Sequence, residues 1–195
     1  MKRLLDVLLG GMGLMLSLPV MGIVAWLIWR QGDGPVLFRQ TRVGRNFKPF
    51  TLLKFRSMRV VSNPALQITA SNDPRITPLG RLLRKTKLDE LPQLWNVLRG
   101  DMSLVGPRPE VEKYVAHFRE AYAEILRVRP GITDPVSLFY LNEEALLKAQ
   151  SDPEAYYLEV LLPKKIALTQ AYLAQTNSWR DMGILWKTFT KLLYR

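Results

Sequence analysis

Two adjacent carboxylates, Asp89 and Glu90, lie between a basic run and an apolar run in the segment RKTKLDELPQLWNVLRGDMSLVGPRP. Paired acids next to cations can hold a phosphate group together with Mg²⁺, because this ion prefers oxygen ligands and arginine binds phosphate oxygens. The cations on either side of the pair include Arg84, Lys85, Lys87 and Arg108. We therefore expect a site for a phosphorylated ligand around the two acids.

The same two acids also fit the start of a helix. Asp89 is a good N-cap residue, because its carboxylate accepts hydrogen bonds from free backbone amides, and Pro92 is tolerated in a first turn. A helix N-terminus favours anions, so a carboxylate there stays ionised and a phosphate can share the same amides. The spacing alone leaves the capping role and the chemical role open.

The composition limits the kinds of partner. The chain has 195 residues, which suits one domain of ordinary size or a small domain with an appendage. Its formal net charge of +11 predicts a polyanionic partner: nucleic acid, anionic lipid head groups or a phosphorylated small molecule. It has no cysteine and one histidine, His117, which excludes disulfides, thiolate metal sites and imidazole clusters within it. Any metal bound by this chain would have oxygen ligands.

An uncharged, apolar run of 23 residues extends from Val7 to Trp29. A straight helix needs about 20 residues to cross the hydrocarbon core of a membrane, so the run is long enough. It continues into bulky residues without a small-residue cleavage site, so we expect it to stay attached instead of acting as a signal peptide. Asp6 is costly in lipid and is expected at the membrane interface near Lys2 or Arg3.

Two features predict that this run turns back instead of crossing. Pro19 lies in its middle, where proline kinks or breaks a helix, and Ser17 can bond the carbonyls that are freed. Basic residues flank both ends, and positive charge near the ends of a membrane segment favours the cytoplasmic side. These flanking residues are Lys2, Arg3, Arg30, Arg39, Arg42 and Arg45. We expect a re-entrant helical hairpin over residues 1–31, broken at Ser17 and Pro19.

The last residues of the chain form a second amphipathic pattern. From residue 178 to residue 195, basic and apolar residues recur on opposite faces of a helix. The basic face holds Arg180, Lys187, Lys191 and Arg195, and the apolar face holds Met182, Leu185, Trp186, Phe189 and Leu193. Such a helix lies either in a membrane interface or on a protein core, and the apolar run elsewhere in the chain favours the interface.

Short strands and helices are expected between these two segments. Residues 34–58 are rich in β-branched and aromatic types and predict two strands joined by a turn at Gly44. Residues 63–78 predict a loop, and the predicted helices are 79–85, 89–98 and 109–122. The expected fold class is α+β and mostly helical. It comprises a re-entrant membrane anchor over 1–31 and a compact cytoplasmic domain over 32–195, with a small β-hairpin and interfacial amphipathic helices.

Several motifs of the chain occur together in a known family. In chain order these are GPVLFRQ, KFRSM, DPRITPLGRLLRKTKLDELPQLWNVLRGDMSLVGPRP and RPGIT. With them the sequence strongly resembles, over nearly its whole length, the bacterial sugar transferase family, the small monotopic phosphoglycosyl transferases. The resemblance implies that Asp89 is a nucleophile and Glu90 its partner in an acidic dyad associated with Mg²⁺. It also implies substrate or phosphate contacts for Arg84 and Arg108, and for Lys54 and Arg56 of KFRSM at the edge of the site.

The resemblance further implies a reaction and a place for it. Asp89 would attack the β-phosphate of a nucleoside diphosphate sugar, expected to be a UDP-sugar, and release UMP. A polyprenol phosphate, undecaprenyl phosphate, would then take the phosphosugar and so begin a bacterial surface glycan. The expected location is the bacterial inner membrane, with a monotopic anchor in its lipid and the catalytic domain on the cytoplasmic face. No nucleic-acid partner is expected, and a homodimer remains an open alternative.

Two departures from the family pattern leave details open. The usual Ser-Pro pair is here an SLP triplet at residues 17–19, so the bend at the proline is expected to persist but the role of the serine does not transfer. The sequence DPV at residues 134–136 follows RPGIT, where many members have Gly-Trp. Neither the sugar nor the glycan pathway can therefore be transferred from the family.

Two functions of other classes remain open from the residues alone. A non-catalytic membrane-bound adaptor would use its basic faces to bind anionic lipid, with Asp89 and Glu90 only capping a helix. A nucleic-acid binder would explain the charge, but not the apolar run or an acid pair that repels phosphates without a metal. An enzyme instead requires the acid pair to converge with Arg84 and Arg108 on one pocket.

Overall fold

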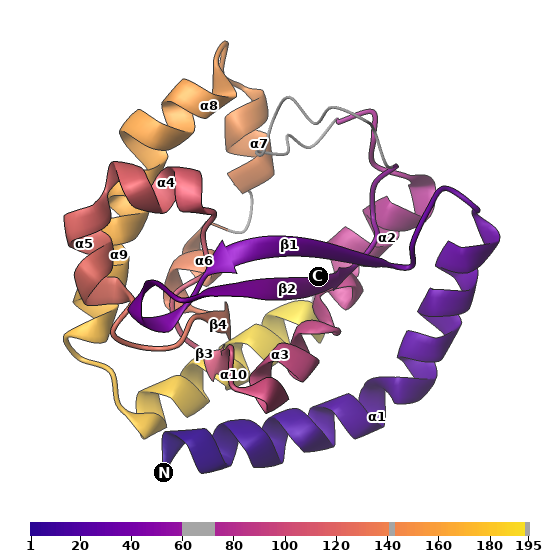
Figure 1. Cartoon of the computed structure of the whole chain (residues 1–195), viewed down its shortest axis with the longest axis horizontal. Coiled ribbons are helices and arrows are strands. Elements are labelled where there is room, and N and C mark those ends of the chain that lie inside the picture. The colour runs from indigo at the N-terminus through magenta and orange to yellow at the C-terminus, as the bar shows by residue number, and fades with distance from the viewer. Residues whose placement is uncertain (60–72, 141–142, 194–195) are drawn as a thin grey trace.

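The computed structural model describes residues 1–59, 73–140 and 143–193 and confirms a mostly helical α+β chain with small sheets (Figure 1). The helices are α1 (Lys2–Arg30), α2 (Pro78–Thr86), α3 (Gln93–Arg99), α4 (Glu112–His117), α5 (Arg119–Ile125), α6 (Pro135–Phe139), α7 (Glu143–Lys148), α8 (Pro153–Tyr156), α9 (Leu162–Leu173) and α10 (Ser178–Leu193). The strands are β1 (Leu37–Val43), β2 (Pro49–Phe55), β3 (Ser103–Val105) and β4 (Gly131–Thr133). Two 3₁₀ turns, η1 (Arg45–Phe47) and η2 (Leu88–Glu90), and one π-helical turn, η3 (Tyr157–Leu161), complete the described elements.

The predicted β-hairpin is confirmed. β1 and β2 pair antiparallel, with Phe38 opposite Lys54. The turn begins after Gly44, and Asn46 within it adopts a left-handed φ of 55°, which asparagine tolerates better than most residues. Figure 1 shows the hairpin crossing the middle of the molecule. Because β2 packs against η2 and α3, the hairpin carries Lys54 toward the acid pair.

A second sheet, which was not expected, is a parallel pair of short strands. β3 pairs with β4, and Ser103 lies opposite Gly131. The chain after β3 approaches this pair so closely that a Cβ atom on Gly131 would lie 2.1 Å from the Gly106 nitrogen. Only glycine permits that approach, and the contact fixes the path of the chain from Gly106 toward Arg108.

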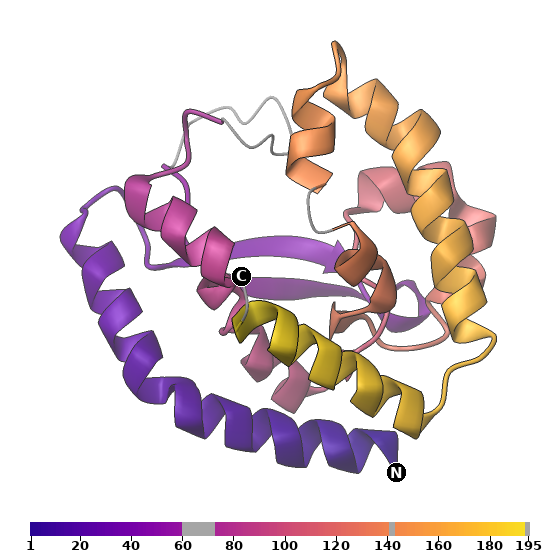
Figure 2. The same ribbon diagram turned by 180° about the vertical axis from the view of Figure 1, so that it is seen from behind.

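α1 is one continuous helix of 29 residues. Among the described residues it is the helix that is long and apolar enough to cross a membrane, with a mean hydropathy of 2.1 in its apolar window. Figures 1 and 2 show that it bends about midway, and Pro19, the usual kind of residue at such a bend, lies inside it. The Ser17 hydroxyl donates to the Leu14 carbonyl at 3.0 Å. The chain therefore bends within one helix, where a break between two helices was expected.

Both ends of α1 are tied to the rest of the chain. Near its start, Lys2 forms an ion pair with Asp181 of α10, and Arg3 donates to two carbonyls of α3. Near its end, Ile28 is fully buried and its carbonyl accepts a hydrogen bond of 3.1 Å from Arg56. Figure 2 shows α1 passing along the outside of α3 and α10 and then turning beside α2. The helix thus wraps around the domain that follows it.

Asp6 lies inside the protein, and its expected place at a membrane interface near Lys2 or Arg3 stays a prediction. Its buried carboxylate accepts hydrogen bonds of 2.9 Å from the Ser103 hydroxyl and from the Leu104 amide. A buried carboxylate needs such partners, and β3, which supplies them, lies about a hundred residues away in the chain. Asp6 therefore fastens α1 to β3.

The predicted helices around the acid pair are partly correct. The helix predicted over 79–85 is confirmed as α2. The helix predicted over 89–98 is wrong at its start, because α3 begins at Gln93 and the residues before it form η2. Lys87 ends α2 in a left-handed conformation with φ of 58°, so the chain turns sharply just before the acids.

The helix predicted over 109–122 is divided into α4 and α5. Phe118 separates them with a non-helical backbone (φ −125°, ψ 41°) while it packs against a core cluster. In that cluster α4 and α5 meet α9 through buried residues that include Tyr114 and Leu162. Most of the loop predicted over 63–78 lies outside the described residues.

α10 buries one side and exposes another. The buried side packs on β3 and β4 through Ile184, and Thr188 shares a hydrogen bond of 2.8 Å with Thr133. The exposed side carries an apolar row at helical spacing: Trp179, Met182, Trp186 and Phe189. Leu193, predicted on the apolar face, and Arg195, predicted on the basic face, fall outside the side chains that the structure describes. α10 therefore packs on the core and also presents an apolar row outward.

Candidate active site

The two acids lie in η2, the short turn between α2 and α3. Both side chains are buried, with exposed fractions of 6% for Asp89 and 8% for Glu90. Neither η2 nor α3 has a side-chain capping bond, and Pro92 occupies the N-cap position of α3. Asp89 is therefore not an N-cap, although it is an acid of the first turn of η2, as the alternative reading of the sequence expected.

Glu90 is held by two cations. Its Oε1 atom accepts hydrogen bonds from the Lys54 ammonium at 2.8 Å and from the Arg108 guanidinium at 3.2 Å. Burial opposes ionisation of Glu90, but the charges of Lys54 and Arg108 outweigh burial and hold its pKa well below the usual range. The Glu90 charge in turn raises the pKa of Arg108. Glu90 is thus an ionised anchor that fixes the positions of two cations.

Asp89 differs from its neighbour in both partners and pKa. Its buried Oδ1 atom has no hydrogen-bond partner among the described residues. Burial raises the pKa of Asp89, although nearby cations, led by Lys54, act against that effect. The negative charge of Glu90 is balanced by Lys54 and Arg108, whereas Asp89 has an oxygen without a partner among the described residues and a more basic carboxylate. Environments that separate two carboxylates in this way are typical of sites where the two have different roles.

The charges around the pair make the site positive. Four cations act on the two acids: Lys54, Arg84, Lys87 and Arg108. The resulting excess of positive charge favours an anionic ligand such as a diphosphate. Of the expected cations, the structure therefore brings Lys54, Arg84, Lys87 and Arg108 close enough to act on the acid pair.

Arg56 is placed differently from the other predicted cations. It is buried, and its Nη2 atom donates to the Ile28 carbonyl in the last turn of α1. Its Nη1 atom is buried without a hydrogen-bond partner among the described residues. Arg56 therefore joins the KFRSM motif to α1 and keeps one donor for a ligand.

Mg²⁺ is the expected cofactor, and the acid pair meets part of its requirements. Within the described residues, no group of three or more His, Cys, Asp or Glu side chains could hold a metal ion. Mg²⁺ is commonly bound by one or two carboxylates together with substrate phosphates and waters. The unpartnered Oδ1 atom of Asp89, next to the Glu90 carboxylate, fits this mode of binding. The pair is therefore suited to Mg²⁺ that is held jointly with a diphosphate.

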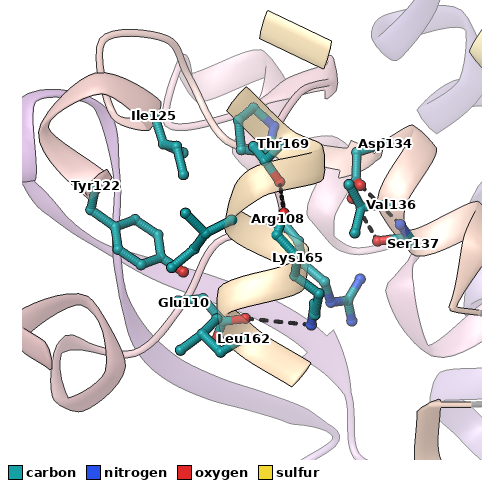
Figure 3. A pocket seen from close by; sticks show the side chains of 12 residues that line it. Arg108, Glu110, Tyr122, Ile125, Asp134, Val136, Ser137, Leu162, Lys165 and Thr169 are labelled. Carbon is teal, nitrogen blue, oxygen red and sulfur yellow. Dashed lines mark hydrogen bonds and ion pairs between the residues drawn. The ribbon is translucent and has the colours of Figure 1, made fainter. Parts of the chain in front are cut away.

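A small pocket lies beside Arg108 and is lined by residues of α5, α6 and α9 (Figure 3). Its free space of about 20 Å³ is room for about one water molecule. Figure 3 shows Lys165 next to Arg108, with Asp134 and Ser137 to one side. Asp134 caps α6 by accepting from the Ser137 amide at 2.9 Å. The DPV sequence at residues 134–136 therefore builds a capped helix at the wall of this pocket.

A second charged cluster, the Glu110 network, is formed by Arg42, Glu110, Glu143, Tyr157 and Lys165, and two of these residues, Glu110 and Lys165, also line the pocket. Glu110 accepts from the Tyr157 hydroxyl at 2.7 Å and pairs with Arg42 at 3.5 Å. Lys165 pairs with Glu143 at 3.1 Å and lies 3.9 Å from the Glu110 carboxylate. This network could not be predicted from sequence, because its members come from distant segments that only the fold brings together.

Gln93, a buried polar residue of α3, was also not among the predicted site residues. Its Nε2 atom has no hydrogen-bond partner among the described residues. Gln93 follows Asp89 by four residues, a spacing that places two residues on one side of a helical segment. That spacing was the signal that could have identified it.

Comparison with known proteins identifies the family. The family described as Bacterial sugar transferase matches residues 1–195. This chain belongs to the bacterial sugar transferase family. As in the sequence analysis, the segment with the acid pair is the longest of the motifs that carry the family resemblance.

Several relatives of this bacterial sugar transferase have named activities. A UDP-glucose:undecaprenyl-phosphate glucose-1-phosphate transferase of Caulobacter vibrioides is 38% identical, over 98% of this chain and 69% of the relative. A protein of the same name from Escherichia coli is 36% identical, over 98% of this chain and 40% of the relative. A putative undecaprenyl-phosphate N-acetylgalactosaminyl 1-phosphate transferase of Bacillus subtilis is 42% identical, over 60% of this chain and 66% of the relative. The chain thus spans about two fifths of the E. coli relative, and the sugars in these names differ.

Proposed function

We propose that this bacterial sugar transferase moves a phosphosugar from a nucleoside diphosphate sugar to a polyprenol phosphate through a covalent intermediate on Asp89. The observation that carries the proposal is the buried Asp89 carboxylate, with an unpartnered oxygen and a raised pKa beside an ionised Glu90. A carboxylate is a weak nucleophile but a good leaving group, which suits an intermediate that must be both formed and broken. The names of two relatives support a UDP-sugar as donor and undecaprenyl phosphate as acceptor.

The proposed reaction has two displacements at one phosphorus atom. In the first, a carboxylate oxygen of Asp89 attacks the β-phosphorus of the donor. The bond from that phosphorus to the bridging oxygen breaks, and the nucleoside monophosphate leaves with the electron pair. In the second, a phosphate oxygen of the polyprenol phosphate attacks the same phosphorus, and Asp89 leaves as a carboxylate. The product is a polyprenyl-diphosphate sugar.

The cations of the site have a common task in both displacements. Charge on the transferred phosphoryl oxygens is stabilised best by groups that are already fixed in place, and Glu90 fixes Lys54 and Arg108. The Arg108 side chain is 37% exposed, so it remains accessible to a ligand while it is anchored. Asp89 and Glu90 are the residues that would hold Mg²⁺ together with the diphosphate, and the ion would further neutralise the phosphoryl oxygens.

We also propose that residues 1–31 are a monotopic anchor whose two ends lie on the cytoplasmic face of the bacterial inner membrane. The ion pair of Lys2 with Asp181 and the hydrogen bond of Arg56 to Ile28 tie both ends of α1 to one domain. A straight helix of this length would separate its ends by about 43 Å across the membrane, which would break one of these contacts. The bend in α1 and the exposed apolar row of α10 support a protein that lies in one face of the membrane.

The anchor can be tested by thiol labelling, because the chain has no cysteine of its own. One variant has a cysteine inserted after Met1, and the other is Gln31→Cys. In inverted inner-membrane vesicles, an impermeant thiol reagent should label both positions, and in right-side-out vesicles it should label neither. Labelling of the two positions from opposite faces would show that α1 crosses the membrane.

The covalent mechanism is tested with purified protein in liposomes that lack polyprenol phosphate. The parent is offered a panel of nucleotide sugars, and we expect release of at most one nucleoside monophosphate per protein and a phosphosugar mass on Asp89. Asp89→Asn keeps the size of the side chain, so it should fold normally and give neither signal. Parental turnover by Asp89→Asn would exclude the intermediate. A parent that releases no nucleoside monophosphate from any donor would favour a membrane-bound adaptor instead.

A further inference from the structure

Three buried side-chain nitrogen or oxygen atoms of the described residues have no hydrogen-bond partner: Asp89 Oδ1, Arg56 Nη1 and Gln93 Nε2. A buried polar atom without a partner is destabilising, so in a native protein it marks a place that a ligand, an ion or a water molecule completes. Asp89 and Arg56 are already candidates for the phosphate site. Gln93 has no part in the mechanism described above.

Gln93 lies on the same buried side of the chain as Asp89. Four positions at spacings of three and four residues have exposed fractions of 6% or less: Asp89, Gln93, Asn96 and Val97. η2 and α3 both contact β2, and Asn96 of this set is hydrogen-bonded to that strand. β2 also supplies Lys54, which binds the acid pair. Gln93 is therefore the next buried polar group along the face that begins with Asp89.

Asn96 shows how an amide with a structural role is bound at this face. Its Oδ1 atom accepts from the Leu53 amide at 3.1 Å, and its Nδ2 atom donates to the Thr51 carbonyl at 2.8 Å. Both ends of the Asn96 side chain are thus used to fasten α3 to β2. Gln93, about one turn nearer to Asp89, has a buried amide donor that makes no comparable bond to the described residues. Bonds among the described residues therefore do not account for the Nε2 donor of Gln93.

We propose that Gln93 is a catalytic residue whose side-chain amide donates a hydrogen bond to an oxygen of the phosphoryl group at Asp89. The inference rests on the proposed function. Lys54 and Arg108, which Glu90 holds in place, supply positive charge. The neutral amide of Gln93 can instead orient the phosphoryl oxygen without changing the net charge of the site. A fixed donor in a buried site stabilises developing negative charge more strongly than it would in water. The ligand then provides the partner that the Gln93 donor otherwise lacks.

The first test is Gln93→Met, which keeps the approximate length of the side chain but removes the donor. Phosphosugar transfer should fall at least ten-fold, while the melting temperature should equal or exceed that of the parent, because a buried unpartnered donor has been removed. The matched control is Asn96→Leu on the same face. Its melting temperature should fall, because the Leu53 amide and the Thr51 carbonyl lose their partner.

These outcomes separate a catalytic role from a structural one. A parental transfer rate in Gln93→Met would overturn the inference, and it is also the result expected if Nε2 only binds a structural water. A loss of activity that accompanies a lower melting temperature, as in Asn96→Leu, would also overturn it. If Gln93→Met does not fold, Gln93→Glu preserves the shape and places an acceptor where the donor was, and it should show the same ten-fold loss. A Gln93→Glu variant with parental activity would contradict the proposal.

Binding of inorganic pyrophosphate with Mg²⁺ distinguishes failure of this inference from failure of the covalent mechanism. Pyrophosphate should raise the melting temperature of the parent and raise it less in Gln93→Met, whether or not a donor is turned over. An equal rise in both proteins would reject the Gln93 contact and leave the covalent mechanism standing. A smaller rise in the variant, together with no intermediate on Asp89, would reject the covalent mechanism alone. No rise in the parent would reject the Gln93 contact, and together with no intermediate on Asp89 it would reject both.

Discussion

The acid pair in η2 and the Glu110 network are two buried clusters of similar residue types that differ in how completely they are paired. In the Glu110 network, Tyr157 and Arg42 bind Glu110, and Lys165 binds Glu143. In the acid pair, Glu90 is bound by two cations, but an oxygen of its neighbour has no partner among the described residues. The segment 107–110 contributes to both, because Arg108 binds Glu90 and Glu110 belongs to the network.

The comparison indicates how buried charges that serve the fold differ from those that serve a ligand. A buried group that is fully paired within the chain stabilises one arrangement and has no capacity left for a ligand. A buried group with an unpartnered atom weakens the fold and is retained where a ligand completes it. The Glu110 network should therefore respond to mutation in stability, and the acid pair should respond in activity.

The largest expected effect on stability is that of Lys165→Met in the Glu110 network. Removal of this cation leaves Glu110 and Glu143 without their shared partner, which should cost about 3 kcal/mol, the lower end for a broken buried pair, because Glu143 is partly exposed. That loss corresponds to a fall in melting temperature of about 6–12 °C for a chain of this size. The neighbouring, exposed Lys164→Met is the control and should change little. Equal melting temperatures of the two variants would contradict a structural role for the network.

A smaller effect, on activity, is expected for Arg108→Lys in the acid pair. Lysine keeps the charge that neutralises Glu90 but loses the planar guanidinium that can bind Glu90 and a phosphate at once. Transfer should fall about ten-fold, corresponding to about 1.4 kcal/mol of transition-state contact, with an unchanged melting temperature. Arg127→Lys at an exposed position is the control and should transfer at the parental rate. Binding to anionic liposomes should be the same in all three proteins. A parental rate in Arg108→Lys, or a joint loss of lipid binding and activity, would contradict the assigned role.

The smallest expected effect is a difference between the two acids in the pH dependence of stability. The raised pKa of Asp89 means that its contribution to stability is present at low pH and is lost as pH rises through its folded-state pKa. The lowered pKa of Glu90 means the reverse: its contribution is present above its usual pKa and is lost as pH falls through the folded-state value. The melting temperature of Asp89→Asn minus that of the parent should therefore increase from acid to neutral pH. The same difference for Glu90→Gln should decrease. The same trend in both variants would show that the two carboxylates do not differ in environment.

Local sequence patterns were sufficient for the regular elements that depend on neighbouring residues. The turn at Gly44 between two β-rich runs predicted the hairpin, and the helical spacing over 79–85 predicted α2. The helix predicted from residue 89 began too early, because the left-handed conformation of Lys87 has no clear signal in sequence. The burial of Asp6 against β3 could not be predicted, since its partners lie about a hundred residues away.

The chemical groups of the site could be read from the amino-acid sequence: the adjacent acids, the cations of the basic run, the motifs of the family and the apolar segment with its central proline. These features depend on residue type and short spacing, which the chain carries wherever it folds. Which acid is paired depends on the folded chain, because Lys54 comes from β2 and Arg108 from the chain after β3. The fold also leaves the Gln93 donor without a partner among the described residues, whereas both ends of the Asn96 amide are bonded. Pairing and burial depend on contacts between distant segments, and these two properties separate the reactive carboxylate from its neighbour.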